Sequence, residues 1–211
     1  MKNKYIKLFV LLISVVVLSG CVNVGHDSVD SIIAYVINNS NNMTNKVNRG
    51  FKYYIPRGLS ITYKTDFNEI IKSNNYDYYL YVDLISYYNK IETKYEVDEN
   101  AYYSQVINDK GLITITKNDN KYLIDLNYNY ATMQVMVKEK DINMAVSNMM
   151  IITSSISYND DTIRAMFDEG VLSTNEKPVS IFKNVDENNK ELLELDEEFY
   201  YEEQKDRDFI K

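Results

Sequence analysis

Hydrophobic side chains recur with a helical period at two places in the chain. From Val29 to Ile37 they repeat every three to four positions, which is the stripe of an amphipathic helix. The asparagine-rich run 38–42 favours a turn and should end this helix. A second stripe extends from Ile142 to Ile156. The pattern therefore predicts two helices that pack one face each on a core.

Polar residues precede both stripes and are candidate helix caps. Asp27 or Ser28 can accept hydrogen bonds from the free N–H groups at the start of the first helix. Asp141 has the same position before the second helix. Methionines in the second stripe have no cysteine or histidine beside them, so we expect them in the core and predict no metal site.

Between the two stripes, apolar and polar residues alternate with a period of two, as in half-buried strands. The segment 76–85 is substantial on both faces, which predicts a central strand. Residues 65–75 look irregular, with a helical turn near 67–71, and 89–100 read as a charged loop. The predicted strands cover residues 51–55, 59–63, 76–85, 102–107, 112–116, 122–128 and 131–137.

This order of elements predicts the α+β class: a mainly antiparallel sheet of about six or seven strands, with an N-terminal and a long C-terminal helix packed on it. We assign the domain to residues 28–158. Beyond it the pattern weakens into a C-terminal extension, 159–185, with a short helix at 161–169 and an edge strand at 178–182. Residues 186–211 form an acidic tail.

The N-terminus has the three parts of an export signal: lysines, an apolar run and a small-residue cleavage site. The apolar run, Leu8–Leu18, is too short for a membrane-spanning helix, which needs about 20 residues. Its end, Leu18-Ser19-Gly20-Cys21, resembles the lipobox of bacterial lipoproteins. The resemblance implies a signal peptide of residues 1–20, acylation of Cys21 and a tether of residues 21–27. It places the protein on the extracytoplasmic face of the cell membrane, and the Asn-, Lys-, Ile- and Tyr-rich composition is typical of low-GC Firmicutes.

A second resemblance concerns the domain. The segment GFKYYIPRGL (Gly50–Leu59) is similar to the opening strand and Pro-x-Gly turn of PsbP-like domains, although Leu59 stands where an aromatic residue is usual. The helix 141–157, which ends in SSIS, looks like their closing helix. In element order the resemblance covers residues 28–158. It implies a PsbP-like sandwich and a non-catalytic accessory role, with no catalytic residues to carry over.

The net charge of −8 is concentrated in the tail. Residues 186–211 hold 11 acidic and 4 basic side chains, a net charge of −7, so the rest of the chain is nearly neutral. No run of lysine and arginine is present to neutralise phosphates, which argues against nucleic acid as a partner. For the same reason we expect no electrostatic attraction to anionic lipid headgroups, and acylation is the predicted membrane attachment.

Residues for catalysis are scarce. His26 is the only histidine and lies close to Cys21, the only cysteine, so His-dependent triads, histidine metal sites and internal disulfides are not expected. Asp77 and Asp83 would lie about 20 Å apart on one strand, too far for a paired acid and base. We therefore expect no enzyme activity and no cofactor.

Two functions remain. The first is an accessory or interaction subunit for another envelope protein, with Tyr79, Tyr81 and Tyr87 or the tail residues Phe199, Tyr200 and Tyr201 as the candidate surface. The second is a lipoprotein that binds a small molecule or a glycan. Three or more exposed tyrosines around a concave pocket would favour the second function, and a flat, partly apolar face would favour the first.

Overall fold

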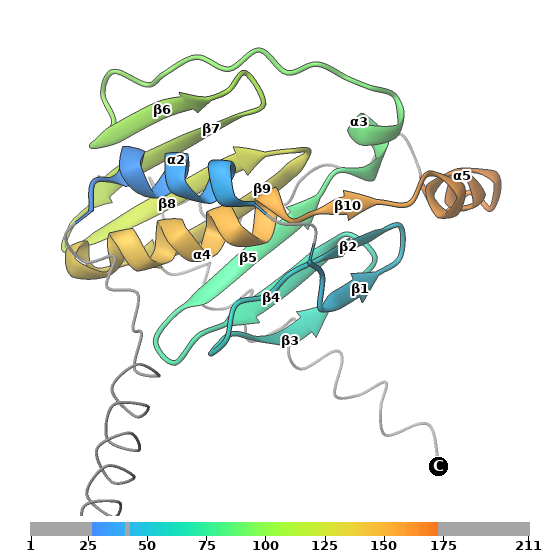
Figure 1. Cartoon of the computed structure of the whole chain (residues 1–211), viewed down its shortest axis with the longest axis horizontal. Coiled ribbons are helices and arrows are strands. Elements are labelled where there is room, and N and C mark those ends of the chain that lie inside the picture. Colours follow the sequence, from blue (N-terminus) through green and yellow to red (C-terminus); the bar gives the residue numbers. More distant parts are fainter. Residues whose placement is uncertain (1–26, 41–42, 173–211) are drawn as a thin grey trace, which may run out of the picture.

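The computed structural model describes residues 27–40 and 43–172 (Figure 1). Several predictions concern residues outside these ranges. They are the signal peptide, acylation of Cys21, the edge strand at 178–182 and the acidic tail.

The domain is built on a seven-stranded antiparallel sheet in the order β3-β4-β5-β9-β8-β7-β6. Its strands are β3 (Ser60–Lys64), β4 (Asn68–Lys72), β5 (Asp77–Val82), β6 (Tyr103–Ile107), β7 (Gly111–Asn118), β8 (Lys121–Tyr128) and β9 (Ala131–Val137). Strands that follow one another along the chain lie side by side, with one exception. Strand β5 is separated from β6 and pairs with β9 instead. The predicted α+β class with a six- or seven-stranded antiparallel sheet is confirmed.

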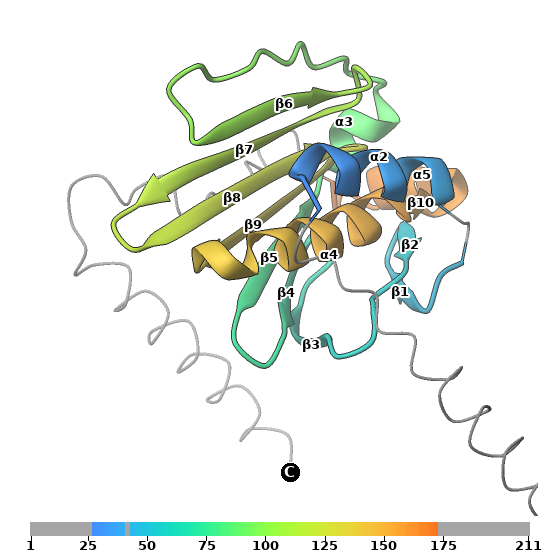
Figure 2. The same cartoon turned by 60° about the vertical axis from the view of Figure 1, so that its left-hand side comes forward.

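The two predicted helices are α2 (Val29–Asn39) and α4 (Ile142–Ser154), and both lie on one face of the sheet (Figures 1 and 2). Helix α4 packs on β8 and β9, and α2 packs on α4. Ser28 caps α2, because its hydroxyl accepts from the N–H of Ser31 at 3.2 Å. Asp141 precedes α4 but makes no capping bond, so the prediction of its capping role is wrong. Its carboxylate instead accepts from the hydroxyl of Tyr76 at 2.6 Å.

A second sheet has the order β1-β2-β10, with β1 (Lys46–Asn48), β2 (Phe51–Tyr53) and β10 (Ser157–Tyr158). The predicted strand 51–55 therefore belongs to this small sheet. The two sheets are joined by Glu69 of β4, which is 1% exposed. Its carboxylate accepts from the hydroxyl of Tyr53 and from the side-chain amide of Asn48, at 2.7 Å for the amide. The turn predicted at Pro56–Gly58 is present, and Gly58 has the positive φ of 86° that it requires.

The predicted central strand is present as β5, although its end differs, and one other predicted element is of the wrong kind. The strand predicted at 76–85 ends at Val82, because the carboxylate of Asp83 accepts from the N–H of Ser86 at 2.8 Å and starts helix α3 (Leu84–Tyr88). The helical turn predicted near 67–71 is strand β4. Its inward positions hold Glu69 and Ile71, and the carboxylate at a core position hides the alternation of the strand.

The chain after the sheet contributes to the same core. A short 3-10 helix η2 (Glu139–Asp141) leads into α4, and α5 (Asp160–Asp168) follows β10. Helix α5 matches the helix predicted at 161–169. Ile163 and Met166 of α5 are fully buried, and Leu172 is nearly so. They belong to the main hydrophobic cluster, so the core extends beyond residue 158, the predicted limit of the domain.

Candidate functional site

Tyr79 and Tyr81 lie on the face of the large sheet that is turned away from the helices. Successive residues of a strand point to opposite faces, and Tyr78, Leu80 and Val82 of the same strand are buried on the helical side. No described helix or strand packs against the opposite face, which we call the open face (Figures 1 and 2). Strand β5 has a neighbour on each side, so both tyrosines are held on a rigid support.

The open face combines aromatic, aliphatic and polar side chains. Residues directly opposite each other in neighbouring strands share a face, which extends the face from Tyr79 to both edges of the sheet. Its central members are Tyr63, Ile70, Tyr79, Tyr81, Leu112, Leu123, Asp125, Asn127, Thr132, Gln134 and Met136. Such a mixture is typical of protein–protein interfaces, which combine tyrosine, methionine and a limited number of hydrogen-bonding groups.

The polar groups of the open face are fixed by one another. The carboxylate of Asp125 accepts from the amides of Gln134 at 2.7 Å and Asn127 at 3.1 Å. The hydroxyl of Thr132 donates to Asn127 at 2.6 Å. Gln134 is only 4% exposed although it lies on this face. The centre of the open face is therefore preorganised, which lowers the entropy cost of binding.

Tyr87, the third tyrosine predicted for this surface, lies elsewhere. It belongs to α3, where its ring stacks on Tyr158 with centroids 3.8 Å apart and its hydroxyl donates to Asp160 at 2.8 Å. The ammonium of Lys90 lies 3.9 Å from the centre of the ring. Burial and the neighbouring Asp160 carboxylate raise the pKa of Tyr87 to about 12. Tyr87 thus joins α3 to β10 and α5, and the structure does not bring it together with Tyr79 and Tyr81.

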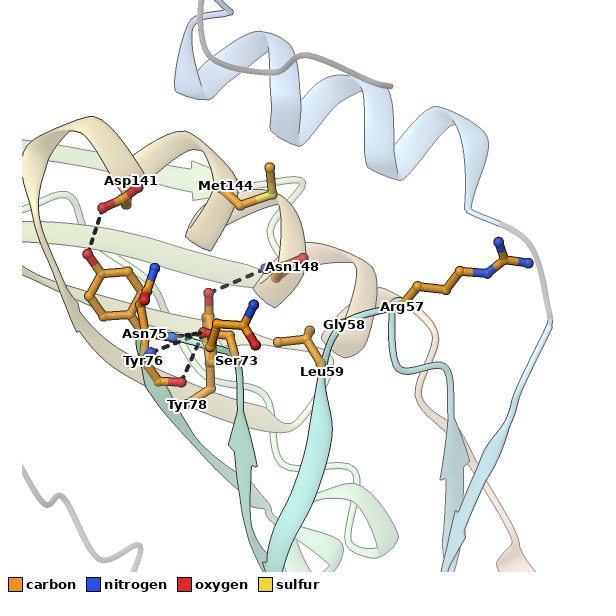
Figure 3. Close-up of a pocket in the computed structure, with 11 residues that line it drawn as sticks. Arg57, Gly58, Leu59, Ser73, Asn75, Tyr76, Tyr78, Asp141, Met144 and Asn148 are labelled. Atoms are coloured by element: carbon orange, nitrogen blue, oxygen red, sulfur yellow. Dashed lines mark hydrogen bonds between the residues drawn. The ribbon is translucent and has the colours of Figure 1, made fainter. Parts of the chain in front are cut away.

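A pocket of about 220 Å³ lies between the start of α4 and the β4–β5 turn (Figure 3). Its polar wall comes from two hydrogen-bonded pairs: Tyr76 with Asp141 at 2.6 Å, and Asn148, which donates to the hydroxyl of Tyr78 at 3.3 Å. Burial is the main cause that raises the pKa of Tyr76, and the hydrogen bond to Asp141 raises it further. Arg57 lies at the rim, and in Figure 3 its guanidinium points away from both tyrosines. The pocket can hold a small polar molecule, but two tyrosines line it rather than three.

A larger groove of about 660 Å³ runs between α2 and α4. Its walls include Val36 and Ile151, and three large side chains on it are well exposed: Tyr35 at 67%, Met43 at 59% and Met144 at 51%. The groove is therefore a partly apolar surface on the helical layer. Sequence patterning did not indicate it, because the helical period says which stripe is buried but not how far apart two helices lie.

The buried Glu69 is another titratable group to consider as a candidate catalytic residue. Burial raises its pKa, and the hydrogen bonds from Tyr53 and Asn48 with the charges of Lys64 and Lys46 partly offset that rise. A buried carboxylate with a shifted pKa is a candidate catalytic group when it faces a cavity. Glu69 lines none of the pockets described above, so we interpret it as the joint between the two sheets.

The described part of the chain lacks two other functional signals. It contains no group of three or more histidine, cysteine, aspartate or glutamate side chains that could hold a metal ion, and no helix that is long and apolar enough to cross a membrane. The predicted residues Cys21, Phe199, Tyr200 and Tyr201 lie outside the described ranges. A scan against the known protein families and a search of the curated proteins find no match for this chain.

Proposed function

We propose that this protein is a membrane-tethered, non-catalytic lipoprotein that serves as an accessory or interaction subunit for another cell-envelope protein. Acyl chains on Cys21 hold it at the extracytoplasmic face of the cell membrane, and the partner binds the open face. The observation that carries the proposal is this face, with Tyr79 and Tyr81 beside a preorganised polar centre and no described element covering it. The resemblance of Gly50–Leu59 to PsbP-like domains supports an accessory role.

The anchor supports this function physically. One acyl chain binds a membrane only marginally, whereas two or three hold a protein stably. A tethered protein meets a membrane-bound partner at a high effective concentration, so the contact surface itself can be modest. Replacing Cys21 with alanine should therefore release the protein from the membrane fraction and abolish partner binding together. Cys21→Ala protein that remains membrane-bound without detergent would contradict the anchor.

The chemistry of tyrosine supports the choice of surface. A tyrosine ring offers a large contact area with few rotatable bonds, and its hydroxyl can form a hydrogen bond at the edge of an interface. Replacing Tyr81 with glutamate places a charge where an aromatic contact is expected. The substitution is at a half-exposed position, so folding should persist while partner binding is lost.

Photo-crosslinking in intact cells tests the proposal directly. A benzoylphenylalanine at position 81 should capture one envelope protein, whereas the same group at position 35 of α2 is the matched control on the helical layer. Tyr35 is well exposed, so the control tests location rather than accessibility. Capture from position 35 and not from position 81 would place the docking surface on the helical layer and refute the proposal. Turnover of a peptide, glycan or phosphoester by purified protein, lost on substitution of one carboxylate, would refute the non-catalytic assignment.

The alternative is a lipoprotein that binds a small molecule or a glycan. The pocket beside Tyr76 and Tyr78 favours it, since amide, carboxylate and phenol groups converge on about 220 Å³. A ligand there should raise the melting temperature of the wild type. Asn148→Leu, which removes the amide that lines the pocket, should abolish that rise. A ligand-induced rise that survives Asn148→Leu would exclude this pocket.

A further inference from the structure

The connection between α3 and β6 has the sequence pattern of a strand but belongs to neither sheet. Over residues 91–98, which we call the connecting segment, side chains that favour strands alternate with charged ones. The strand formers are Ile91, Thr93, Tyr95 and Val97, and the charged residues are Glu92, Lys94, Glu96 and Asp98. Figures 1 and 2 show the connection as an open loop along the outer side of β6.

The backbone of the connecting segment is unpaired over six residues. The N–H of Ile91 donates to the carbonyl of Ser86 at 3.0 Å, and the N–H of Asp98 donates to the hydroxyl of Ser104 at 3.0 Å. Between these two bonds, no backbone group of residues 92–97 has a hydrogen-bond partner in the described part of the chain. All side chains of the segment except Tyr95 are exposed. The segment therefore presents the hydrogen-bonding groups of an edge strand to solvent.

The turn before β6 keeps the connecting segment from folding back on that strand. This turn, 98–101, is closed by the N–H of Ala101, which donates to the carbonyl of Asp98 at 3.3 Å. The paired β6–β7 hairpin has positive φ at both Asn108 and Asp109, whereas neither central residue of the turn 98–101 has a positive φ. Turns with negative φ at both centres splay the two arms, because their twist does not match that of paired strands.

The sequence of the segment is complementary to itself in antiparallel orientation. Residues directly opposite each other in such a pair share a face of the sheet. With Tyr95 of two copies on the two-fold axis, Lys94 of each lies opposite Glu96 of the other, and Thr93 lies opposite Val97. Opposite charges and paired strand formers stabilise this arrangement. Neither Lys94 nor Glu96 has an ion-pair partner among the described residues.

Neighbouring registers that keep the two faces apart are less favourable. An axis through Lys94 places this lysine opposite itself and Glu92 opposite Glu96, so that only like charges meet. An axis through Thr93 requires residues 89–91, and their N–H groups already donate to carbonyls of α3. The axis through Tyr95 is therefore the register that the charges and the unpaired backbone favour.

We infer that the connecting segments of two copies of this chain pair antiparallel about Tyr95, with residues 93–97 of each copy in the ladder. Glu92 and Asp98 meet only at its open ends, where water and salt screen their repulsion. Five residues per copy are fewer than the roughly 20–30 of a stable interface, so the contact is weak between free molecules. Copies held on one membrane meet at a high effective concentration, and for this strength the inference rests on the proposed anchor.

Cysteine crosslinking tests the pairing and its register. The chain 22–211 contains no cysteine, and an N-terminal histidine tag holds it on phosphatidylcholine vesicles that contain a nickel-chelating lipid. Thr93→Cys and Val97→Cys proteins are oxidised separately and as an equal mixture, and dimers are measured on non-reducing gels. Opposite Cα atoms lie about 4.5–5.5 Å apart, within reach of a disulfide, whereas the two copies of residue 93 lie about 14 Å apart. We expect dimers to form at least about tenfold faster in the mixture than in either protein alone.

A charge exchange provides the matched control. Tyr95→Cys lies on the axis, so this protein should form dimers without a second variant. In the same background, Lys94→Glu places glutamates opposite each other and Glu96→Lys places lysines opposite each other, so each change alone should slow the dimer. A mixture of the two should restore the rate, because every glutamate then faces a lysine.

Val47→Cys on β1, where the side chain is 71% exposed, measures random collision. Crosslinking of Tyr95→Cys no faster than that of Val47→Cys, no gain in the mixture of Thr93→Cys and Val97→Cys, or no rescue by charge exchange would each overturn the inference. An internal disulfide between Tyr95→Cys and Ser104→Cys in place of dimers would overturn it too, because the segment would then pair with its own β6. The test contains neither acyl chains nor a partner protein, so it can fail while crosslinking from position 81 in cells succeeds, and the reverse.

Discussion

The joint between the two sheets allows a prediction whose size and pH dependence both follow from the structure. Tyr53→Phe removes the hydroxyl that donates to Glu69 and leaves the ring, and therefore the packing, almost unchanged. Glu69 is 1% exposed, so water cannot replace the lost donor. A hydrogen bond to a charged group contributes about 1.5–3 kcal/mol. For a domain of this size such a loss should lower the melting temperature by about 4–10 °C.

The cost should depend on pH in a defined direction. Burial raises the pKa of Glu69 above its ordinary value, and the bond from Tyr53 is one of the contacts that lower it. The stability that the protonated carboxyl contributes is fully present below its unfolded pKa and is lost as pH rises through the folded pKa. Removing the hydroxyl raises the folded pKa further, so Tyr53→Phe should cost more at pH 7 than at pH 4.5. In a Glu69→Gln background, most of this pH dependence should disappear.

Urea denaturation of the unlipidated chain, residues 22–211, at pH 4.5 and pH 7 measures these effects. Tyr54→Phe is the matched control, because Tyr54 is its half-buried neighbour and its hydroxyl has no bond to Glu69. The control should change the free energy of unfolding by less than about 0.5 kcal/mol. If Tyr53→Phe behaves like the control, or costs more at pH 4.5 than at pH 7, the buried hydrogen bond to an ionisable carboxylate is refuted.

Three further substitutions test other parts of the fold by the same denaturation measurement. Met166→Ala should cost about 2–5 kcal/mol because it leaves a cavity under α5, and a negligible effect would show that the core ends before residue 160. Gly111→Ala should destabilise the β7–β8 pair by at least about 1–3 kcal/mol, because the new methyl group would lie 2.1 Å from the carbonyl oxygen of Asn127; wild-type stability would disprove this close approach. Asp83→Ala should cost about 1 kcal/mol, because the N–H of Ser86 loses the side chain that caps α3. Asp83→Asn should retain most of the wild-type stability, and equal losses in the two variants would implicate charge rather than capping.

Local patterning predicted most of the regular elements. The helical stripe of α2 and the alternation in β7, β8 and β9 appear as buried positions where they were expected, because each depends on one periodic face that must leave water. The turn at Asp119–Asn120 between β7 and β8 was equally local. Antiparallel pairing of these neighbours followed from short connections.

The errors arose where a partner distant in sequence changes the meaning of a residue. A carboxylate at position 69 interrupts the apolar alternation of β4, yet Tyr53 and Asn48 satisfy the hydrogen bonds of Glu69 in the core. Asp83 ended a strand that the alternation continued, because a carboxylate that accepts from a backbone N–H favours a helix start over an extended chain. Tyr87 lies on the helix that follows, and it was therefore grouped with Tyr79 and Tyr81 on a surface to which it does not belong.

One part of the candidate site could be predicted from the sequence, and the other part depends on the tertiary structure. Alternation along one strand was enough to put Tyr79 and Tyr81 on a common face, since side chains two residues apart always share one. The polar centre of that face needs Asp125 and Gln134, which are brought together only by the pairing of β8 with β9. The same pairing brings Lys121 next to Lys138, which is 17 positions away in the sequence. A sequence thus determines which side chains share an element and a face, because those relations depend on local backbone geometry. Only the tertiary structure decides which faces and charges meet, because that depends on how the whole chain buries its apolar surface.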